Sequence, residues 1–120
     1  MNLPRKVKIV EMGPRDGLQN EREIIPAPIK IELINKLTVN GFAFIEVGSF
    51  VSPKWVPQMA DTEDVMAGIR RKSGVVYSVL VPNMKGFEGA LLANADEIAI
   101  FGAASEEFSK KNINLSLIHI

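Results

Sequence analysis

The first candidate for chemistry in this chain is an arginine followed directly by an aspartate. Arg15 and Asp16 come after Gly13 and Pro14, just beyond the short apolar stretch at residues 7–11. A Gly-Pro turn at the end of a strand would hold this cation and anion at the mouth of a sheet. The carboxylate could then bind a divalent metal, and the guanidinium could stabilise an oxyanion. The alternative is a solvated ion pair on a surface turn, which contributes little.

A second group of polar residues belongs to the apolar stretch at residues 43–49. Glu46 lies between Ile45 and Val47, so we expect its carboxylate to be partly buried and to require a partner. It is either a structural acid paired with a base on a neighbouring strand or a functional carboxylate. Ser49 ends the stretch, and by itself a serine at that place indicates no chemistry.

The composition is that of an ordinary globular protein and excludes several kinds of site. The chain has 120 residues, 47% of them hydrophobic, with 14 basic and 14 acidic side chains. Zero net charge argues against a nucleic-acid or membrane partner, and no apolar run is long enough to span a bilayer. Cysteine is absent, and we see no signal or transit peptide, so we expect a cytoplasmic protein.

Strand and helix patterns alternate along the chain. We expect strands at residues 7–11, 43–48, 75–81 and 97–101. Each is followed by a segment with apolar residues at helical spacing, at residues 26–40, 61–69, 83–91 and 105–111. Asp61 and Asn83 are suited to begin helices, and Gly41 and Gly74 to end them. The alternation predicts an α/β fold with a parallel sheet.

Two architectures fit this alternation. A small open doubly wound sheet is complete near this length. A closed TIM barrel of eight strand–helix units requires about 250 residues, so this chain would be the N-terminal half of one. Local patterns do not separate the two, because both place their polar groups at the ends of strands.

Four sequence blocks together resemble 3-hydroxy-3-methylglutaryl-CoA lyases. The blocks lie at residues 13–21, 45–59, 81–87 and 100–106, and the likeness extends from residue 7 to residue 114. The resemblance implies that residues 1–114 are the first four β/α units of a TIM (β/α)8 barrel. It also implies metal-dependent cleavage of the acyl-CoA to acetyl-CoA and acetoacetate, in leucine degradation.

The resemblance also implies a role for each site residue. Arg15 matches the catalytic, substrate-binding arginine, and Asp16 matches a ligand of the divalent metal, Mg²⁺ or Mn²⁺. Glu46 matches the active-site carboxylate, either as the base or as a group that orients it. Gln19 and Ser49 fall in the same blocks and are placed in the substrate pocket. An acyl-CoA is thus the expected partner, and the complete protein is expected to be a homo-oligomer.

The sequence also departs from the family. The family completes its metal site with two histidines and an asparagine, and uses a cysteine as acid, all in segments that this sequence lacks. The likeness ends after Asn114, so we expect residues 115–120 to be a tail outside the family and His119 not to be a metal ligand. We therefore expect this fragment alone to be inactive and to expose apolar surface.

Two other interpretations stay open. Condensing synthases and oxo-acid aldolases of the same barrel superfamily also place an Arg-Asp pair after their first strand. A non-catalytic α/β module that binds a partner through its sheet edges is also compatible with the length and composition. Such a module would be monomeric or a defined dimer and would unfold cooperatively.

Overall fold

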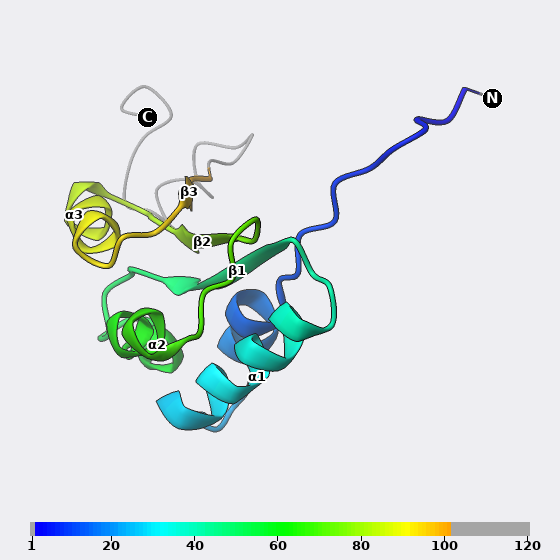
Figure 1. Cartoon of the computed structure of the whole chain (residues 1–120). Coiled ribbons are helices and arrows are strands. Elements are labelled where there is room, and N and C mark those ends of the chain that lie inside the picture. The colour runs from blue at the N-terminus through cyan, green and yellow to red at the C-terminus, as the bar shows by residue number, and fades with distance from the viewer. Residues whose placement is uncertain (1, 102–120) are drawn as a thin grey trace.

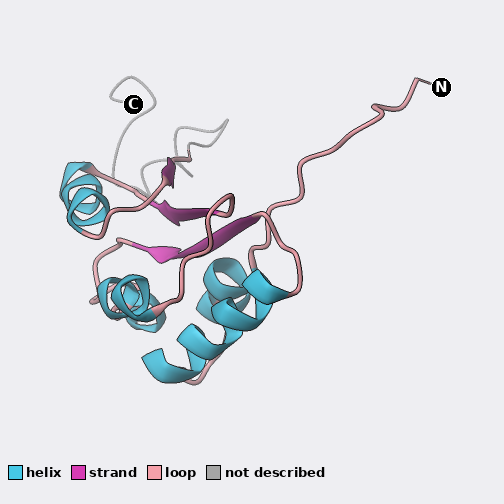
Figure 2. Cartoon of the chain, viewed as in Figure 1, coloured by secondary structure: helices cyan, strands magenta, loops and turns pink. Residues whose placement is uncertain are grey.

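Three parallel strands form the sheet at the centre of the structure. The computed structural model describes residues 2–101, and across the sheet the strands are β1 (Phe44–Ser49), β2 (Val76–Leu80) and β3 (Glu97–Ala99). The helices are α1 (Ala27–Val39), α2 (Thr62–Gly68) and α3 (Met84–Leu92). Two short turns, η1 (Gly13–Gly17) and η2 (Pro57–Met59), complete the elements. Helices α1 and α2 pack beside β1 (Figure 1, Figure 2), and the parallel α/β fold is as predicted.

The predictions made for residues 102–120 lie outside the described residues. These predictions are the last part of the sequence block at residues 100–106, the helix at residues 105–111, the tail at residues 115–120, and the expectation that His119 is not a metal ligand. The boundary at residue 114 stays a prediction.

Prolines set the start of α1 and a glycine follows its end. Pro26 has an extended backbone (φ −64°, ψ 150°) just before the helix, and Pro28 lies in its first turn, where the missing N–H breaks no helical bond. Gly41 follows with φ of +93°, a conformation that side chains with a Cβ disfavour. The helix predicted at residues 26–40 is thus confirmed to within one residue at each end.

The core lies between the sheet and the helices. Ile45, Val47 and Val79 are between 0% and 2% exposed and form its strand side. Ile34 of α1 and Val65 of α2 pack on them from the helix side. Near-continuous burial along β1 is typical of a parallel strand that is covered on both faces.

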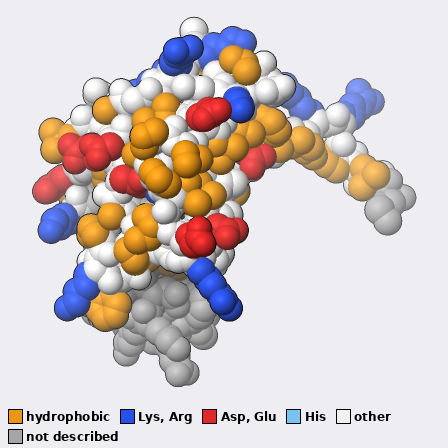
Figure 3. All heavy atoms as spheres, turned by 90° about the horizontal axis from the view of Figure 1, so that it is seen from below, with side chains coloured by type: hydrophobic (Ala, Val, Ile, Leu, Met, Phe, Trp, Pro, Cys, Tyr) orange, Lys and Arg blue, Asp and Glu red, His pale blue; other side chains and the backbone are white. Residues whose placement is uncertain are grey.

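The strand predicted at residues 7–11 is wrong for most of its length. Only Glu11 pairs with β1: its N–H donates to Phe44 O at 2.8 Å, and its carbonyl accepts from Glu46 N at 3.0 Å. Val7 and Ile9 are 64% and 66% exposed on a segment that extends away from the body (Figure 1, Figure 3). A strand requires a hydrogen-bonding partner on at least one edge, and the described residues supply one only at Glu11. The apolar exposure expected of this fragment is confirmed here.

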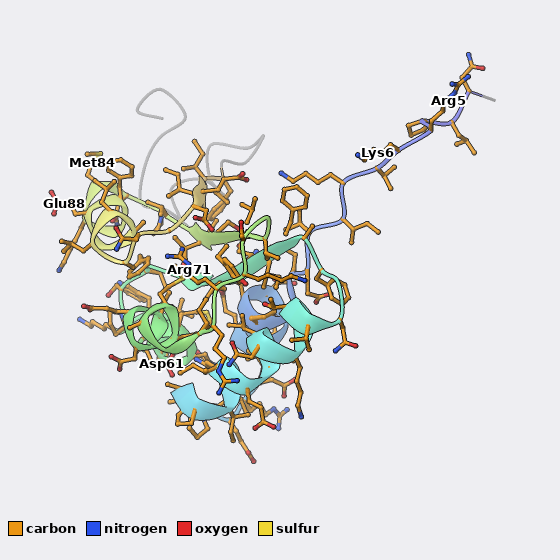
Figure 4. All side chains as sticks on the ribbon, in the orientation of Figure 1. Arg5, Lys6, Asp61, Arg71, Met84 and Glu88 are labelled. Atoms are coloured by element: carbon orange, nitrogen blue, oxygen red, sulfur yellow. The ribbon has the colours of Figure 1, made fainter. Side chains whose placement is uncertain are left out.

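The polar residues around α2 also differ from expectation. Asp61 precedes the helix but makes no capping hydrogen bond, because its carboxylate pairs with Lys30. The helix ends at Gly68, before the basic residues Arg70, Arg71 and Lys72. One of these, Arg71, which Figure 4 labels, contacts the Asp96 carboxylate at 3.7 Å. Gly74, with φ of +87°, lies in the turn that leads to β2.

The start of α3 is fixed by a cap and by close backbone packing. Asn83 Oδ1 accepts a hydrogen bond from Gly86 N at 2.8 Å, which confirms the predicted cap. A Cβ added at Gly86 would lie 2.4 Å from the backbone oxygen of Phe50. Phe50 follows β1 directly, and its N–H donates to Leu80 O at 2.9 Å, so it cannot easily retreat. Gly86 therefore allows α3 to approach the segment after β1.

We predict that Gly86→Ala destabilises the protein. Alanine favours a helix by about 0.5–1 kcal/mol over glycine, but overpacking against fixed backbone costs about 1–3 kcal/mol. The net result should be a lower midpoint of urea unfolding, followed by circular dichroism. Glu88→Ala is the control on the same helix, since Glu88 is exposed and points away from the body (Figure 4). Equal midpoints for Gly86→Ala and the unmodified protein would contradict the packing argument.

Candidate functional site

The Gly-Pro-Arg-Asp-Gly segment forms a single π-helical turn, η1. The carbonyl of Met12 accepts from the N–H groups of Arg15 and Asp16, at 3.2 and 2.8 Å. The N–H of Gly13 donates to Glu11 Oε1 at 2.9 Å, so the side chain of the last paired residue holds the start of the turn. Single π-helical turns are rare and are frequently found at functional sites. The turn predicted from the sequence is confirmed, with a geometry that the sequence did not indicate.

A buried ion pair joins η1 to β1. Arg15 Nε donates to Glu46 Oε1 at 2.7 Å, and the two side chains are 16% and 6% exposed. Glu46 is thus buried and paired, as predicted from its apolar neighbours. The base that pairs with it comes from the η1 turn and not from a neighbouring strand. The contact is short and charge-assisted, which fixes the plane of the guanidinium.

The far side of the guanidinium faces two oxygen-bearing side chains. Arg15 Nη1 lies 3.5 Å from Asp16 Oδ1 and 3.5 Å from Gln19 Oε1. These contacts are long and weak compared with the bond to Glu46. The Asp16 side chain is 60% exposed, so its carboxylate faces solvent at the edge of the site. Arg15 therefore keeps donor capacity on the side that is turned away from Glu46.

An irregularity in β1 decides which of its residues share a face. Glu46 pairs with Ser78 and Gly48 pairs with Val79, so the register shifts by one residue between them. Ser49 then comes opposite Leu80. Ser78 and Leu80 are two positions apart and lie on one face of β2, so the bulge brings Glu46 and Ser49 to one face although they are three positions apart.

Ser49 is held by neighbours of its own. Its N–H donates to Thr62 Oγ1 at 3.2 Å, and Thr62 Oγ1 lies 2.9 Å from the carbonyl of Ser49. The Ser49 hydroxyl donates to Leu80 O at 3.2 Å, and the residue is 2% exposed. Ser49 borders a hollow between the segment after β1 and the start of α3, which Asn83 and Lys85 also line. The structure thus brings four of the predicted site residues together, whereas the fifth, Ser49, lines a hollow to which none of the other four contributes.

The described residues supply part of a metal site at most. Asp16 has an exposed carboxylate, a ligand type that Mg²⁺ and Mn²⁺ prefer. Within residues 2–101 no three histidine, cysteine, aspartate or glutamate side chains converge on one point. Glu46 is occupied by Arg15. The site as described could therefore supply one ligand, Asp16, and does not by itself hold a divalent ion tightly.

Two supporting residues were missed in the sequence. Lys30 is 2% exposed and binds Asp61, and Thr62 is 3% exposed and binds Ser49. Lys30 carries a signal that could have been found, because it falls on the apolar stripe of its helix, four positions before Ile34. A lysine on such a face requires a partner. Thr62 carries no such signal.

Comparison with known proteins identifies the family. The HMGL-like family model matches residues 6–120. Among curated proteins, the mitochondrial hydroxymethylglutaryl-CoA lyase of Rattus norvegicus is 62% identical over 115 residues, 96% of this chain and 35% of the relative. The cytoplasmic 3-hydroxy-3-methylglutaryl-CoA lyase of Mus musculus is 65% identical over 115 residues, 96% of this chain and 34% of the relative. A 3-hydroxy-3-isohexenylglutaryl-CoA/hydroxymethylglutaryl-CoA lyase of Pseudomonas aeruginosa is 59% identical over 117 residues, 98% of this chain and 39% of the relative.

Solved structures give the same result. An HMG-CoA lyase from Brucella melitensis superposes with a TM-score of 0.89 at 64% identity, over 93% of this chain and 40% of that one. One from Acinetobacter baumannii, in complex with coenzyme A and 3-methylmalate, has a TM-score of 0.89 at 43% identity, over 91% and 36%. The chain spans little more than a third of the length of these relatives, and its parallel β/α units are part of a TIM barrel. By sequence and by fold, the chain belongs to the HMGL-like family.

Proposed function

We propose that the complete protein containing this chain cleaves 3-hydroxy-3-methylglutaryl-CoA to acetyl-CoA and acetoacetate, with a divalent metal, in leucine degradation. The observation that carries the proposal is the Arg15–Glu46 pair at 2.7 Å, on a π turn at the end of the sheet. The pair lies in a chain whose relatives are named as lyases of this substrate.

The reaction creates negative charge at one oxygen, which Arg15 is suited to stabilise. The tertiary hydroxyl loses its proton, the bond to the methylene beside the thioester breaks, and its electron pair becomes the enolate of acetyl-CoA. That enolate is then protonated. Arg15 is anchored through Nε and keeps N–H groups on its other side, so it offers an oriented donor to the enolate oxygen. Such a donor contributes about 3–4 kcal/mol in the transition state.

The geometry favours an orienting role for Glu46. Its carboxylate is bound to Arg15 Nε, and its side chain is 6% exposed. A general base must reach the proton that it removes, and this carboxylate already accepts a short bond from a cation. We propose that Glu46 fixes the guanidinium plane and neutralises its charge until the enolate forms.

Asp16, Gln19 and Ser49 are proposed to contact the metal and the substrate. Asp16 would donate one carboxylate oxygen to a divalent ion, of which Mg²⁺ and Mn²⁺ are the candidates, together with ligands from outside the described residues. Gln19 borders the guanidinium, and Ser49 lines the hollow beside the start of α3. An acyl-CoA is the proposed partner, since the relatives act on CoA thioesters by name and one solved neighbour holds coenzyme A.

The cellular location and the assembly stay predictions. Within the described residues, none of the helices has the length and apolar character needed to cross a membrane. The relatives include one protein named as cytoplasmic and one named as mitochondrial, and we keep the cytoplasmic location as the proposal. The homo-oligomer expected of the complete protein is likewise proposed from the family alone.

The second candidate substrate is an acyl-CoA with a longer branch at the hydroxyl-bearing carbon. The Pseudomonas aeruginosa relative is named for both 3-hydroxy-3-isohexenylglutaryl-CoA and the methyl compound. The decisive experiment incubates the complete protein and Mg²⁺ with each thioester separately and measures acetyl-CoA by mass spectrometry. Release from the methyl compound supports the proposal, and release from the isohexenyl compound alone supports the second candidate. Consumption of acetyl-CoA with an oxo acid, without cleavage, would indicate a synthase instead.

We predict that Arg15→Lys lowers kcat of the complete enzyme at least about a hundredfold. Lysine keeps the charge but lacks the planar fork that Glu46 orients. Steady-state assays check the value. Arg70→Lys is the matched control, because Arg70 is exposed, and it should leave kcat unchanged. Full activity in Arg15→Lys would remove Arg15 from the mechanism.

A double-mutant cycle distinguishes the two roles of Glu46. If Glu46 acts only through Arg15, Glu46→Gln should cost little more in kcat when Arg15 is already lysine, because the interaction that it supports is gone. If Glu46 is the base, Glu46→Gln should lower kcat by the same factor whether Arg15 is present or already replaced by lysine. The kcat values of the two single variants and the double variant give the answer.

We predict that Asp16→Asn weakens Mn²⁺ binding to the complete enzyme by at least about tenfold, a loss that even outer-shell changes can cause. The reason is the lost carboxylate charge at an exposed position. Titration of the ion by electron paramagnetic resonance measures it directly, without turnover. Asp64→Asn, an exposed aspartate on α2, serves as control. Identical Mn²⁺ affinity for the Asp16 variant and the parent would exclude Asp16 as a ligand.

A further inference from the structure

Lys30 is the most deeply buried charged residue of the described chain. It is 2% exposed on α1, on the helix face that also carries Ile34. A buried ammonium is unfavourable unless it is paired, and an apolar side chain of similar volume often stabilises such a place as well or better. Packing alone therefore does not account for a lysine at this position.

The Lys30 ammonium binds two groups of the segment that leads from η2 into α2. Nζ lies 2.6 Å from Asp61 Oδ1 and also donates to the backbone carbonyl of Gln58. Asp61 precedes the first residue of α2, and Gln58 lies in η2. Lys30 thus holds both ends of residues 58–61 against α1, and a single cation fixes a stretch that has no strand partner.

These bonds continue into both parts of the proposed site. Gln58 Nε2 donates to the carbonyl of Glu21 at 3.0 Å, in the segment that follows η1 and its Arg15. On the other side, Thr62 follows Asp61 and bonds to the backbone of Ser49 at the end of β1. The segment after η1 and the end of β1 are therefore connected through the residues that Lys30 holds.

We propose that Lys30 is a positioning residue that sets the spacing between the Arg15 side and the Ser49 side of the substrate pocket. The inference rests on the proposed lyase function. Lys30 touches no reacting atom and acts through Gln58 and Asp61. Loss of its ammonium would free residues 58–61 to shift relative to α1, and the segment after η1 and the end of β1 would lose their fixed spacing.

The test is Lys30→Met in the complete enzyme. Methionine retains much of the buried volume, so folded enzyme should be recovered, but KM for the acyl-CoA should rise by about tenfold. A merely structural loss would lower the amount of active enzyme, and hence the apparent kcat, and leave KM unchanged. Lys36→Met on the same helix is the control, because that side chain is 70% exposed and pairs with the exposed Glu32.

A second variant keeps the test decisive if Lys30→Met does not fold. Gln58→Leu removes only the bond to Glu21 O and leaves no buried charge unpaired; its KM should rise about threefold. Hydrogen exchange should be faster in residues 18–23 and 50–61 of either folded variant. A KM in the folded variants that equals the KM of the unmodified enzyme overturns the proposal. If the unmodified enzyme cleaves neither thioester, the proposed function fails. In that case, the positioning role is overturned if hydrogen exchange in these segments is as slow in the variants as in the unmodified enzyme.

Discussion

The carboxylate of Glu46 is buried in the middle of β1, and the arrangement of the site depends on how its charge is balanced. A buried carboxylate without a partner would strongly destabilise the sheet, so a cation must reach it. Arg15 meets this need only because Glu11 pairs with β1 and thereby places η1 beside the strand. The bond that stabilises the charge is the same bond that orients the guanidinium. The burial of this charge and the orientation of the guanidinium therefore have one cause here.

The segment after β1 is held by a second set of contacts that are independent of Arg15. Thr62 bonds to both backbone groups of Ser49, and Gly86 lets α3 come close to the Phe50 carbonyl. The Lys30–Asp61 pair then fixes the remainder of the segment to α1. Both partly buried ion pairs join residues that are 31 positions apart in the chain. Each connects a segment before β1 with β1 itself or with the loop after it, so the strand and its exit are bound from two sides.

Apolar residues near the N-terminus are exposed, as expected for a chain that spans little more than a third of the length of its relatives. Val7 and Ile9 have a strand pattern but meet no partner in the described structure, while Glu11, two positions on, is paired. The relatives are more than twice as long, and their TIM barrels contain further strands and helices. The chain therefore represents part of the family fold, and the proposed activity would require parts of the barrel that this chain does not span.

The sequence by itself determined the alternation of strands and helices between residues 26 and 99, the ends of α1, the cap of α3 and the burial of Glu46. These follow from local rules: apolar spacing, proline and glycine conformations, and the cost of an unpaired charge. Only the tertiary structure decided the π turn, the bulge that puts Glu46 and Ser49 on one face, and the Lys30–Asp61 pair that replaces an expected helix cap. These features depend on which distant segment lies alongside, and short-range sequence patterns do not encode that.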